Sequence, residues 1–297
     1  MSTEPESLLE IRDLTVEVPG VLGERQIGLR KVSLTVSPGE IVVLAGEAGS
    51  GKSLLARLIA GIADPRVKVL AGSISYEGKS LLDLKRRERL ALRRGPFAVI
   101  TDTASAPPHP DGTVRQWLGE IRRLARGNTR EWGDCFFNAG LLEPEQLLAR
   151  RLGDLPPLTL KRLAVVRAML LGSRLLISEE ATSDLDRPSE FAFFELLTRM
   201  RDEFGLAILV TTGSLRGVER FANRVAVFFE GGMLESGTPA ELITSPGFAY
   251  TREFRGCEPV LAGLPRDLPT ISRAALREAG QAVHQSANSL TEPPATG

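Results

Sequence analysis

The chain has 297 residues, of which 42% are hydrophobic and 25% charged, so it can bury one large core or two small ones. Its 37 basic residues equal its 37 acidic residues, which excludes a global electrostatic field that would recruit nucleic acid or an anionic surface. Two cysteines far apart in the sequence exclude a disulfide framework and a cysteine metal cluster, and they suit a reducing compartment.

The N-terminal part of the chain predicts strands. Residues 1–10 are acidic and polar and lack the apolar core of a signal peptide, so we expect no targeting segment there. No apolar run approaches the roughly 20 residues that cross a bilayer, so we expect any membrane role to depend on a partner. Alternating apolar residues predict strands over residues 8–18 and 28–36, and the apolar run 41–45 predicts a third.

A glycine-rich turn follows the third strand and precedes a helical pattern over residues 54–60. Its eight residues are Gly46, Glu47, Ala48, Gly49, Ser50, Gly51, Lys52 and Ser53. In this context the glycines let successive N–H groups point at phosphate oxygens, and the helix N-terminus adds its positive end. We expect Lys52 to reach the terminal phosphates of a nucleoside triphosphate and the Ser53 hydroxyl to ligate Mg²⁺. The alternative is a glycine-rich turn that binds nothing, and the complete motif argues against it.

The rest of the chain alternates strands with helices. Strands are predicted over residues 69–76, 97–101, 174–178, 206–211 and 224–230, and helices over residues 81–94, 113–126, 130–140, 144–151, 163–171 and 188–204. This alternation predicts an α/β fold, with a parallel sheet covered by helices on both faces. Residues 81–94 are strongly basic. A helix for nucleic acid or a membrane surface is one interpretation, but a solvated amphipathic helix suits this neutral chain better. After residue 265, weak periodicity predicts at most a helix near residues 271–284 and then a disordered tail.

This order of parts resembles the ATP-binding subunit of an ABC transporter, in the dipeptide, oligopeptide and nickel importer group. Besides the glycine-rich turn over residues 46–53, which matches the P-loop, the resemblance rests on four segments. They are residues 80–95 (the segment before the Q-loop), 175–186 (Walker B and D-loop), 222–237 (the segment after the switch histidine) and 245–252 (the group's ending). It implies a P-loop NTPase (RecA-like) fold with a mostly parallel sheet, an N-terminal antiparallel β subdomain and a helical insert over about residues 81–167. It also implies a nucleotide-binding domain over residues 1–255 and a partly disordered C-terminal extension over residues 256–297.

The resemblance implies ATP and Mg²⁺ as cofactors and assigns roles to three acidic residues. Glu180 stands where the family has its catalytic base, which polarises the water that attacks the γ-phosphate. Glu179 aligns with the Walker B aspartate and is one methylene longer, so we expect weaker Mg²⁺ binding. For both, the alternative is a pair of acids at a strand end without a ligand role. Asp102 aligns with the Q-loop glutamine, and its acceptor-only carboxylate either approaches Mg²⁺ or is merely a polar loop residue.

Other motif positions depart further from the family. Val18 replaces an aromatic residue that stacks on adenine, a kind of contact worth about 1–3 kcal/mol per base. Gly213 replaces the switch histidine, so no side chain reaches the γ-phosphate from that loop. In the signature segment, Pro156 and Pro157 have no N–H to donate, and Leu158 brings a side chain where the backbone must approach closely. Losing such donors typically costs about 2.7–4 kcal/mol each in catalysis. Because proline suits a helix start, we expect the helix from Leu160 onward to survive.

Three hypotheses for function follow. The first is a MgATP-binding, catalytically degenerate subunit of a heteromeric importer for peptides, peripheral at the cytoplasmic face of the cell membrane. Its expected partners are a second, intact ATPase subunit, two transmembrane permease subunits and, indirectly, an extracytoplasmic substrate-binding protein, with no nucleic acid. The second is a soluble regulatory or scaffolding ATP-binding protein without membrane association. The third is a competent ATPase that uses substitutes such as Asp102 and Ser214. The first is favoured because residues 81–110 resemble the transporter-facing part of the family.

Overall fold

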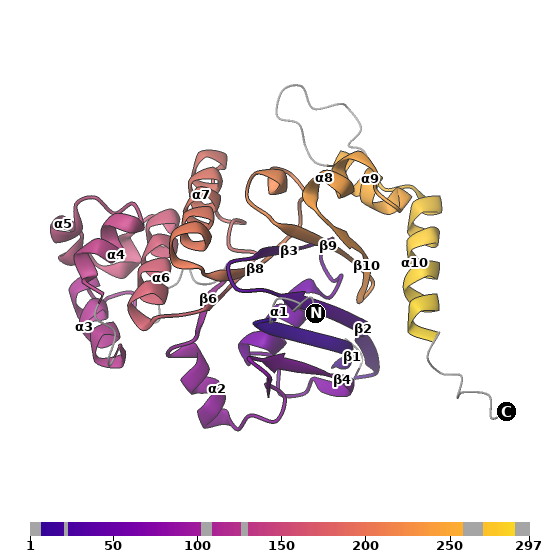
Figure 1. The fold of residues 1–297 in the computed structure, drawn as a ribbon, viewed down its shortest axis with the longest axis horizontal. Coiled ribbons are helices and arrows are strands. Elements are labelled where there is room, and N and C mark those ends of the chain that lie inside the picture. Colours follow the sequence, from indigo (N-terminus) through magenta and orange to yellow (C-terminus); the bar gives the residue numbers. More distant parts are fainter. Residues whose placement is uncertain (1–6, 21–22, 102–108, 126–129, 258–269, 289–297) are drawn as a thin grey trace, which may run out of the picture. The chain divides into compact units, whose positions relative to one another are not determined.

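The computed structural model describes residues 7–20, 23–101, 109–125, 130–257 and 270–288, and its backbone falls into two compact units. The first unit comprises residues 1–37, 42–82 and 211–297, and the second comprises residues 38–41 and 83–210. Figure 1 shows the fold, coloured along the chain, with most of its elements labelled.

An antiparallel sheet in the first unit has the order β2-β1-β4-β5. Its strands are β1 (Leu9–Pro19), β2 (Arg25–Val36), β4 (Lys68–Tyr76) and β5 (Lys79–Ser80). In β1, Leu9 pairs with Val36 of β2, and Ile11 pairs with Leu34. All four side chains are buried, because alternate residues of a strand point to one face of the sheet. The predicted antiparallel β subdomain is confirmed, and β2 begins three residues earlier than expected.

The P-loop follows the first of three neighbouring strands, which lie in the first unit except for Ile41. They are β3 (Ile41–Ala45), β9 (Arg224–Phe229) and β10 (Gly232–Gly237). β3 runs parallel to β9, and its five residues are all buried, as expected for a strand covered on both faces. The helix α1 (Lys52–Ala60) follows. β10 was not predicted, and it pairs with β9 through a two-residue turn in which Glu230 and Gly231 both have positive φ.

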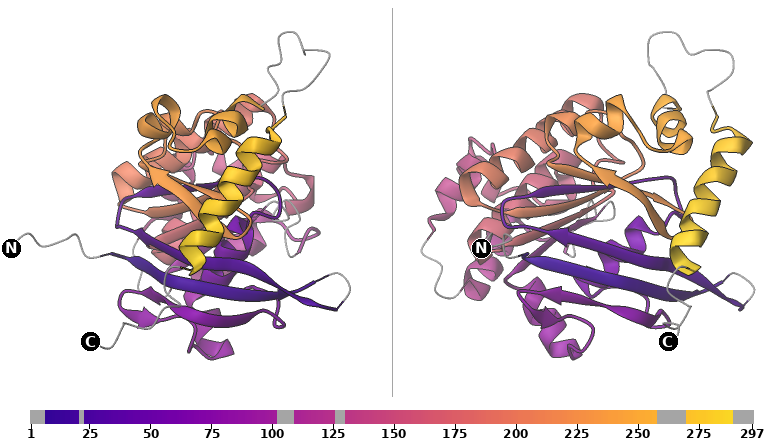
Figure 2. Two further views of the ribbon diagram at one scale, coloured as in Figure 1. Left: turned by 90° about the vertical axis from the view of Figure 1, so that its right-hand side faces the viewer. Right: turned by 45° about the vertical axis from the view of Figure 1, so that its right-hand side comes forward.

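The C-terminal helices also belong to the first unit. They are α8 (Pro239–Thr244), α9 (Ala249–Gly256) and α10 (Arg273–Asn288). Figure 2 shows α10 beside α9 and β10, and its buried residues Ala275, Ala279 and Val283 recur at helical spacing. The helix expected near residues 271–284 is thus present, longer than predicted. Residues 258–269 and 289–297 of the predicted extension lie outside the described residues.

The second unit contains the helical part of the chain. Its elements are α2 (Arg86–Arg93), β6 (Phe97–Thr101), α3 (Val114–Leu124), α4 (Trp132–Asn138), α5 (Pro144–Leu148), η2 (Leu152–Asp154), α6 (Pro157–Leu171), β7 (Leu175–Glu179), α7 (Arg187–Phe204) and β8 (Ala207–Thr212). β6 and β7 are parallel, and α3 and α4 pack against α6 (Figure 1).

The basic helix is shorter than predicted. The prediction of a helix over residues 81–94 was wrong for residues 81–85, because the Glu88 carboxylate accepts a hydrogen bond from the Lys85 backbone N–H at 2.7 Å and caps a helix that begins at Arg86. Leu81 is buried outside the helix, whereas α2 itself buries no residue. The mostly parallel α/β fold with an antiparallel subdomain and helical insert is otherwise as expected.

Among the described residues, no helix combines the length and the hydropathy that a membrane span requires.

Candidate nucleotide site

The three P-loop glycines all have positive φ, and two of them are also tightly packed. Gly46 has φ of 155°, and a Cβ there would lie 2.4 Å from the carbonyl oxygen of Phe228. Gly51 has φ of 100°, and a Cβ there would lie 2.9 Å from Leu29 Cδ2. Gly49 has φ of 82°, but a Cβ there would meet nothing within 4 Å. The loop is therefore packed firmly from behind and faces open space at Gly49, the shape of a cradle for an anion.

Lys52 spans the P-loop, and the first turn of α1 begins beside it. Lys52 is 4% exposed, and its Nζ donates to the Glu47 carbonyl across the loop at 3.1 Å. Gly51 caps α1 without a side-chain acceptor, so no side chain of the cap covers the first N–H groups of the helix. The Ser50 hydroxyl is buried and has no hydrogen-bond partner among the described residues. A phosphate group would satisfy the first N–H groups of α1 and pair with the Lys52 ammonium, so the P-loop residues fit a nucleoside triphosphate.

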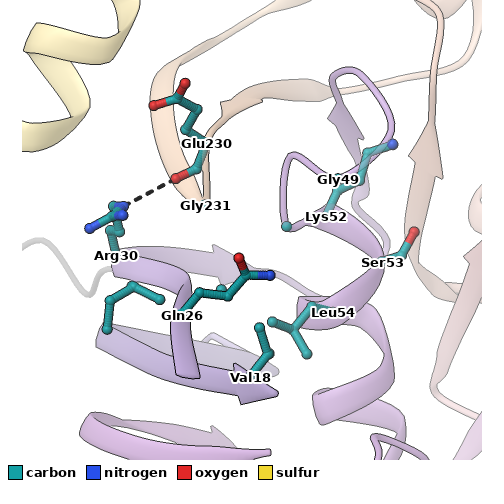
Figure 3. Close-up of a pocket in the computed structure, with 12 residues that line it drawn as sticks. Val18, Gln26, Arg30, Gly49, Lys52, Ser53, Leu54, Glu230 and Gly231 are labelled. Atoms are coloured by element: carbon teal, nitrogen blue, oxygen red, sulfur yellow. Dashed lines mark hydrogen bonds between the residues drawn. The ribbon is translucent and has the colours of Figure 1, made fainter. Parts of the chain in front are cut away.

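A cavity of about 430 Å³ opens beside the P-loop (Figure 3). Residues of the P-loop and of α1, among them Gly49, Lys52 and Ser53, line one side. Strand residues Val18 and Arg30 line the other side, together with Gln26, Gly28, Glu230 and Gly231. The volume suits a small-molecule ligand. Val18 lies in this cavity as expected from the sequence, but Gln26 and Arg30 were missed, because only the fold brings β2 beside the P-loop.

The C-terminal part of the first unit supports the P-loop from behind. The Tyr250 hydroxyl donates to Glu47 Oε2 at 3.3 Å. Burial, followed by the Glu47 charge, raises the pKa of Tyr250, so the phenol keeps its proton and remains a donor. Its ring packs between Phe229 and Phe254, with centroids 4.8 and 5.7 Å away. Gly46 N also donates to the Thr212 carbonyl at 3.3 Å.

The predicted acidic residues lie in the second unit or outside the described residues. Glu179 ends β7 and is 2% exposed. Glu180 follows with φ of 47°, a backbone conformation that costs a non-glycine residue of order 1–3 kcal/mol and recurs at functional sites. Asp102 lies outside the described residues. Within the described residues, no group of three or more His, Cys, Asp or Glu side chains could hold a metal ion, so the Mg²⁺ set of Ser53, Glu179 and Asp102 stays a prediction.

The signature segment begins a regular helix without its usual donors. Pro156 is the N-cap of α6 and Pro157 its first residue, and both are exposed. Leu160 N donates to the Pro156 carbonyl at 3.1 Å, so the helix starts normally. The predicted survival of this helix is confirmed. Because neither proline has an N–H, this helix end presents two donors fewer than an ordinary one.

A buried ion pair one turn further along α6 was not predicted. Lys161 is 1% exposed, and its Nζ lies 2.6 and 2.9 Å from the two carboxylate oxygens of Asp184. Asp184 belongs to the segment between Glu180 and α7, so the pair joins that segment to the signature helix within the second unit. No local sequence pattern predicts this ion pair, because Lys161 and Asp184 are 23 residues apart.

The loop after β8 has room where the family resemblance implies a histidine. A Cβ on Gly213 would meet nothing within 4 Å. The neighbouring Ser214 is held in a local turn, in which its N–H donates to Thr212 Oγ1 at 3.2 Å and its hydroxyl accepts from Arg216 N at 3.0 Å. Ser214 therefore serves its own loop, which weakens the hypothesis that it substitutes for the missing side chain.

Known proteins with similar sequences support the resemblance to the ABC transporter family. The ABC transporter family profile matches residues 29–183. The nickel import ATP-binding protein NikE of Escherichia coli (strain K12) is 36% identical over 225 residues, which cover 74% of this chain and 82% of that protein. The peptidoglycan transport ATP-binding protein YejF of Agrobacterium fabrum is 32% identical over 266 residues. That match covers 86% of this chain but only 48% of YejF, so the chain spans about half the length of that relative.

Solved structures show the same fold. The dimeric ABC transporter cassette MJ0796 superposes with a TM-score of 0.65 at 20% identity, covering 78% of this chain and 98% of that one. CbiO1 of Clostridium perfringens, part of the transporter complex CbiONQ, gives 0.65 at 22% identity, covering 80% and 90%. The predicted resemblance, the fold class and the expectation of ATP with Mg²⁺ as the family's cofactors are confirmed. From its P-loop, its fold and these relatives, the chain belongs to the ABC transporter family, as an ATP-binding cassette.

Proposed function

We propose that this chain binds MgATP at its P-loop and hydrolyses it slowly or not at all by itself, as one subunit of a heteromeric importer. The observation that carries the proposal is the contrast between two helix ends. The N-terminus of α1 has an open glycine cradle with Lys52 across it, whereas the N-terminus of α6 starts with Pro156 and Pro157. The first suits phosphate, and the second presents two donors fewer than an ordinary helix end.

We infer that this chain pairs with a second cassette, as MJ0796 does in its solved structure. The MJ0796 relative is described as a dimer. In a head-to-tail pair, each ATP lies between one subunit's P-loop and the other's signature helix. One site would join this chain's P-loop and Glu180 to an intact signature, and the other would join an intact P-loop to Pro156 and Pro157. A homodimer would carry both defects twice, so we propose an intact ATPase as partner.

Glu179, Glu180 and Asp102 keep the roles that the resemblance gives them. Glu180 would hold and polarise the attacking water, while Ser53, Glu179 and Asp102 would contribute to the Mg²⁺ shell. Mg²⁺ would neutralise charge that develops on the phosphates. The left-handed backbone of Glu180 and the burial of Glu179 support a positioned pair of acids at the end of β7.

The proposed cargo follows from the relatives' names together with the sequence resemblance. NikE is named for nickel import and YejF for peptidoglycan transport. Because the sequence also resembles the peptide importer group, we propose peptides as cargo. The chain would be peripheral at the cytoplasmic face of the membrane and would engage two permease subunits through the insert over residues 81–167, with a substrate-binding protein as an indirect partner. We retain residues 1–255 as the nucleotide-binding domain and residues 256–297 as an extension.

Affinity purification from native membranes tests this proposal. The bait is the chain with an affinity tag, isolated in mild detergent with a non-hydrolysable ATP analogue, and the Lys52→Ala variant is the control. We expect two membrane proteins and a second ATPase of the same family to co-purify. A chain that is recovered alone, and only from the soluble fraction, would support the regulatory or scaffolding alternative.

A further inference from the structure

The base end of the nucleotide cavity carries a guanidinium and an amide in place of an aromatic ring. We propose that Arg30 stacks on the base of a purine nucleoside triphosphate and that Gln26 contacts its edge, with little discrimination between ATP and GTP. This inference rests on the proposed function, because it assigns the base end of the same site.

Two hydrogen bonds hold Arg30 at the wall of the cavity. Its backbone N–H donates to the Gly231 carbonyl at 2.8 Å, and its Nε donates to the Glu230 carbonyl at 3.2 Å. Figure 3 shows this side chain reaching from β2 to the turn between β9 and β10. Because Nε is fixed to a carbonyl, the planar group is oriented before any ligand binds. Its two terminal nitrogens make no hydrogen bond to the described residues.

The charge of Arg30 is available to a ligand. Within the described part of the chain, Arg30 forms no ion pair. The Glu230 carboxylate points away from Arg30 in Figure 3, and its Oε2 lies 3.7 Å from His284 Nε2 of α10. A guanidinium that is oriented, half-buried and not neutralised by a carboxylate is suited to lie against the face of an aromatic base.

Aliphatic side chains form another wall of the same cavity. A Cβ on Gly28 would lie 2.7 Å from Leu54 Cδ2 and 2.8 Å from Val18 Cγ1, so these two side chains close over the strand. They offer apolar contact but no ring that could stack. Among the described residues that line this cavity, Arg30 carries the planar cation on which a base can stack. Stacking on arginine tolerates every base.

Gln26 is the reason why we expect little discrimination between ATP and GTP. It lines the cavity beside Val18, and its amide points into the open space in Figure 3. A side-chain amide both donates and accepts hydrogen bonds, and it can turn to exchange the two. The edge of adenine presents an amino donor beside a nitrogen acceptor, and the edge of guanine presents the reverse. A rotating amide at the cavity mouth serves both bases equally well.

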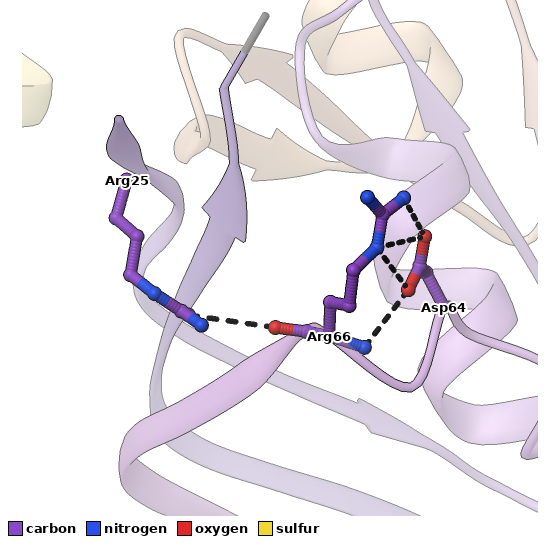
Figure 4. Close-up of polar contacts among 3 residues, drawn as sticks. All are labelled: Arg25, Asp64 and Arg66. Atoms are coloured by element: carbon purple, nitrogen blue, oxygen red, sulfur yellow. Dashed lines mark hydrogen bonds and ion pairs between the residues drawn. The ribbon is translucent and has the colours of Figure 1, made fainter. Parts of the chain in front are cut away.

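Arg25 provides a matched control on the same strand. Its NH1 donates to Glu17 Oε2 at 2.9 Å and to the Arg66 carbonyl at 3.4 Å, while Arg66 is paired with Asp64 at 2.6 Å (Figure 4). Arg25 does not line the cavity. Arg25→Ala therefore removes an exposed cation from β2 without touching the proposed base site.

The test is calorimetric titration of the full chain and its variants with MgATP, MgGTP and tripolyphosphate. We expect the wild type to bind ATP and GTP within about threefold of each other, because Gln26 adapts to both. Arg30→Ala should weaken both nucleotides about five- to thirtyfold and leave tripolyphosphate unchanged, the size expected of a stacked cation. Arg30→Lys keeps the charge but lacks the planar guanidinium, so it should recover only part of the lost affinity. This variant also replaces Arg30→Ala in the test if Arg30→Ala does not fold. Arg25→Ala should match the wild type.

Several outcomes would overturn the inference. An equal loss of nucleotide and tripolyphosphate in Arg30→Ala, or full recovery in Arg30→Lys, would make Arg30 a phosphate contact. Unchanged nucleotide binding in Arg30→Ala would place the base elsewhere while leaving the proposed function intact. A wild type that binds neither nucleotide nor tripolyphosphate would overturn both.

Discussion

Removing Asp184 should destabilise the protein far more than removing its partner Lys161. The Lys161 ammonium is 1% exposed and lies 2.6 and 2.9 Å from both oxygens of Asp184, whose side chain is 26% exposed. Asp184→Ala would leave a charge stranded in the interior, which typically costs about 3–5 kcal/mol. Lys161→Met would leave a carboxylate that water already reaches and would fill the vacated space with an apolar chain. We expect that change to cost at most about 1 kcal/mol.

A double-mutant cycle in urea at neutral pH measures these differences. The free energy of unfolding should fall by about 3–5 kcal/mol in Asp184→Ala, and the added Lys161→Met change should restore most of it. Far-UV circular dichroism of each variant is the control for folding. Equal losses in the two single variants, or a loss below about 1 kcal/mol in Asp184→Ala, would refute the argument from burial.

Four further predictions concern the P-loop support, the two thiols and the loop after β8. Tyr250→Phe should lower the free energy of unfolding by about 0.5–1.5 kcal/mol, because it removes only the hydroxyl that donates to Glu47, whereas Tyr250→Ala should lower it by about 3–5 kcal/mol. Burial raises the pKa of Cys135 from 9.0 to about 11, so stability should fall as pH rises from about 9 to about 11, where the unfolded thiol ionises first. In native protein, Ellman's reagent should label the partly exposed Cys257 before the buried Cys135, which should react only on unfolding. Gly213→His should leave Tm unchanged, since a Cβ there meets nothing within 4 Å.

The predictions for Tyr250, for thiol labelling and for Gly213 each have a contradicting result. A loss as large in Tyr250→Phe as in Tyr250→Ala, measured by urea titration, would mean that the hydroxyl and not ring packing dominates. Two thiols that react equally fast before denaturant is added would contradict the burial of Cys135. A drop of several degrees for Gly213→His in a thermal melt would show that the loop has no room for the side chain.

The features that the sequence predicted depend on local patterns. The P-loop strand was predicted residue by residue, because five consecutive apolar residues precede Gly46. β10 was missed because its pairing depends on a turn in which Glu230, a non-glycine residue, adopts positive φ. α10 was underestimated because two of its buried positions are Ala275 and Ala279, whose small side chains give a weak periodic signal.

The unpredicted parts of the site depend on contacts between distant segments. Arg30 meets the Glu230 carbonyl 200 residues away, and Tyr250 meets Glu47 203 residues away. Motif spacing could identify the phosphate cradle but not these neighbours, because tertiary packing alone brings them together.

The central claim is that the chain binds MgATP but has little hydrolysis of its own. The most direct test measures MgATP binding and phosphate release side by side on the purified protein, with Lys52→Ala as the control. We predict binding that is lost in Lys52→Ala, with phosphate release from the wild type no faster than from that variant. Release well above the variant, and abolished by Glu180→Gln, would contradict the claim and show a competent ATPase.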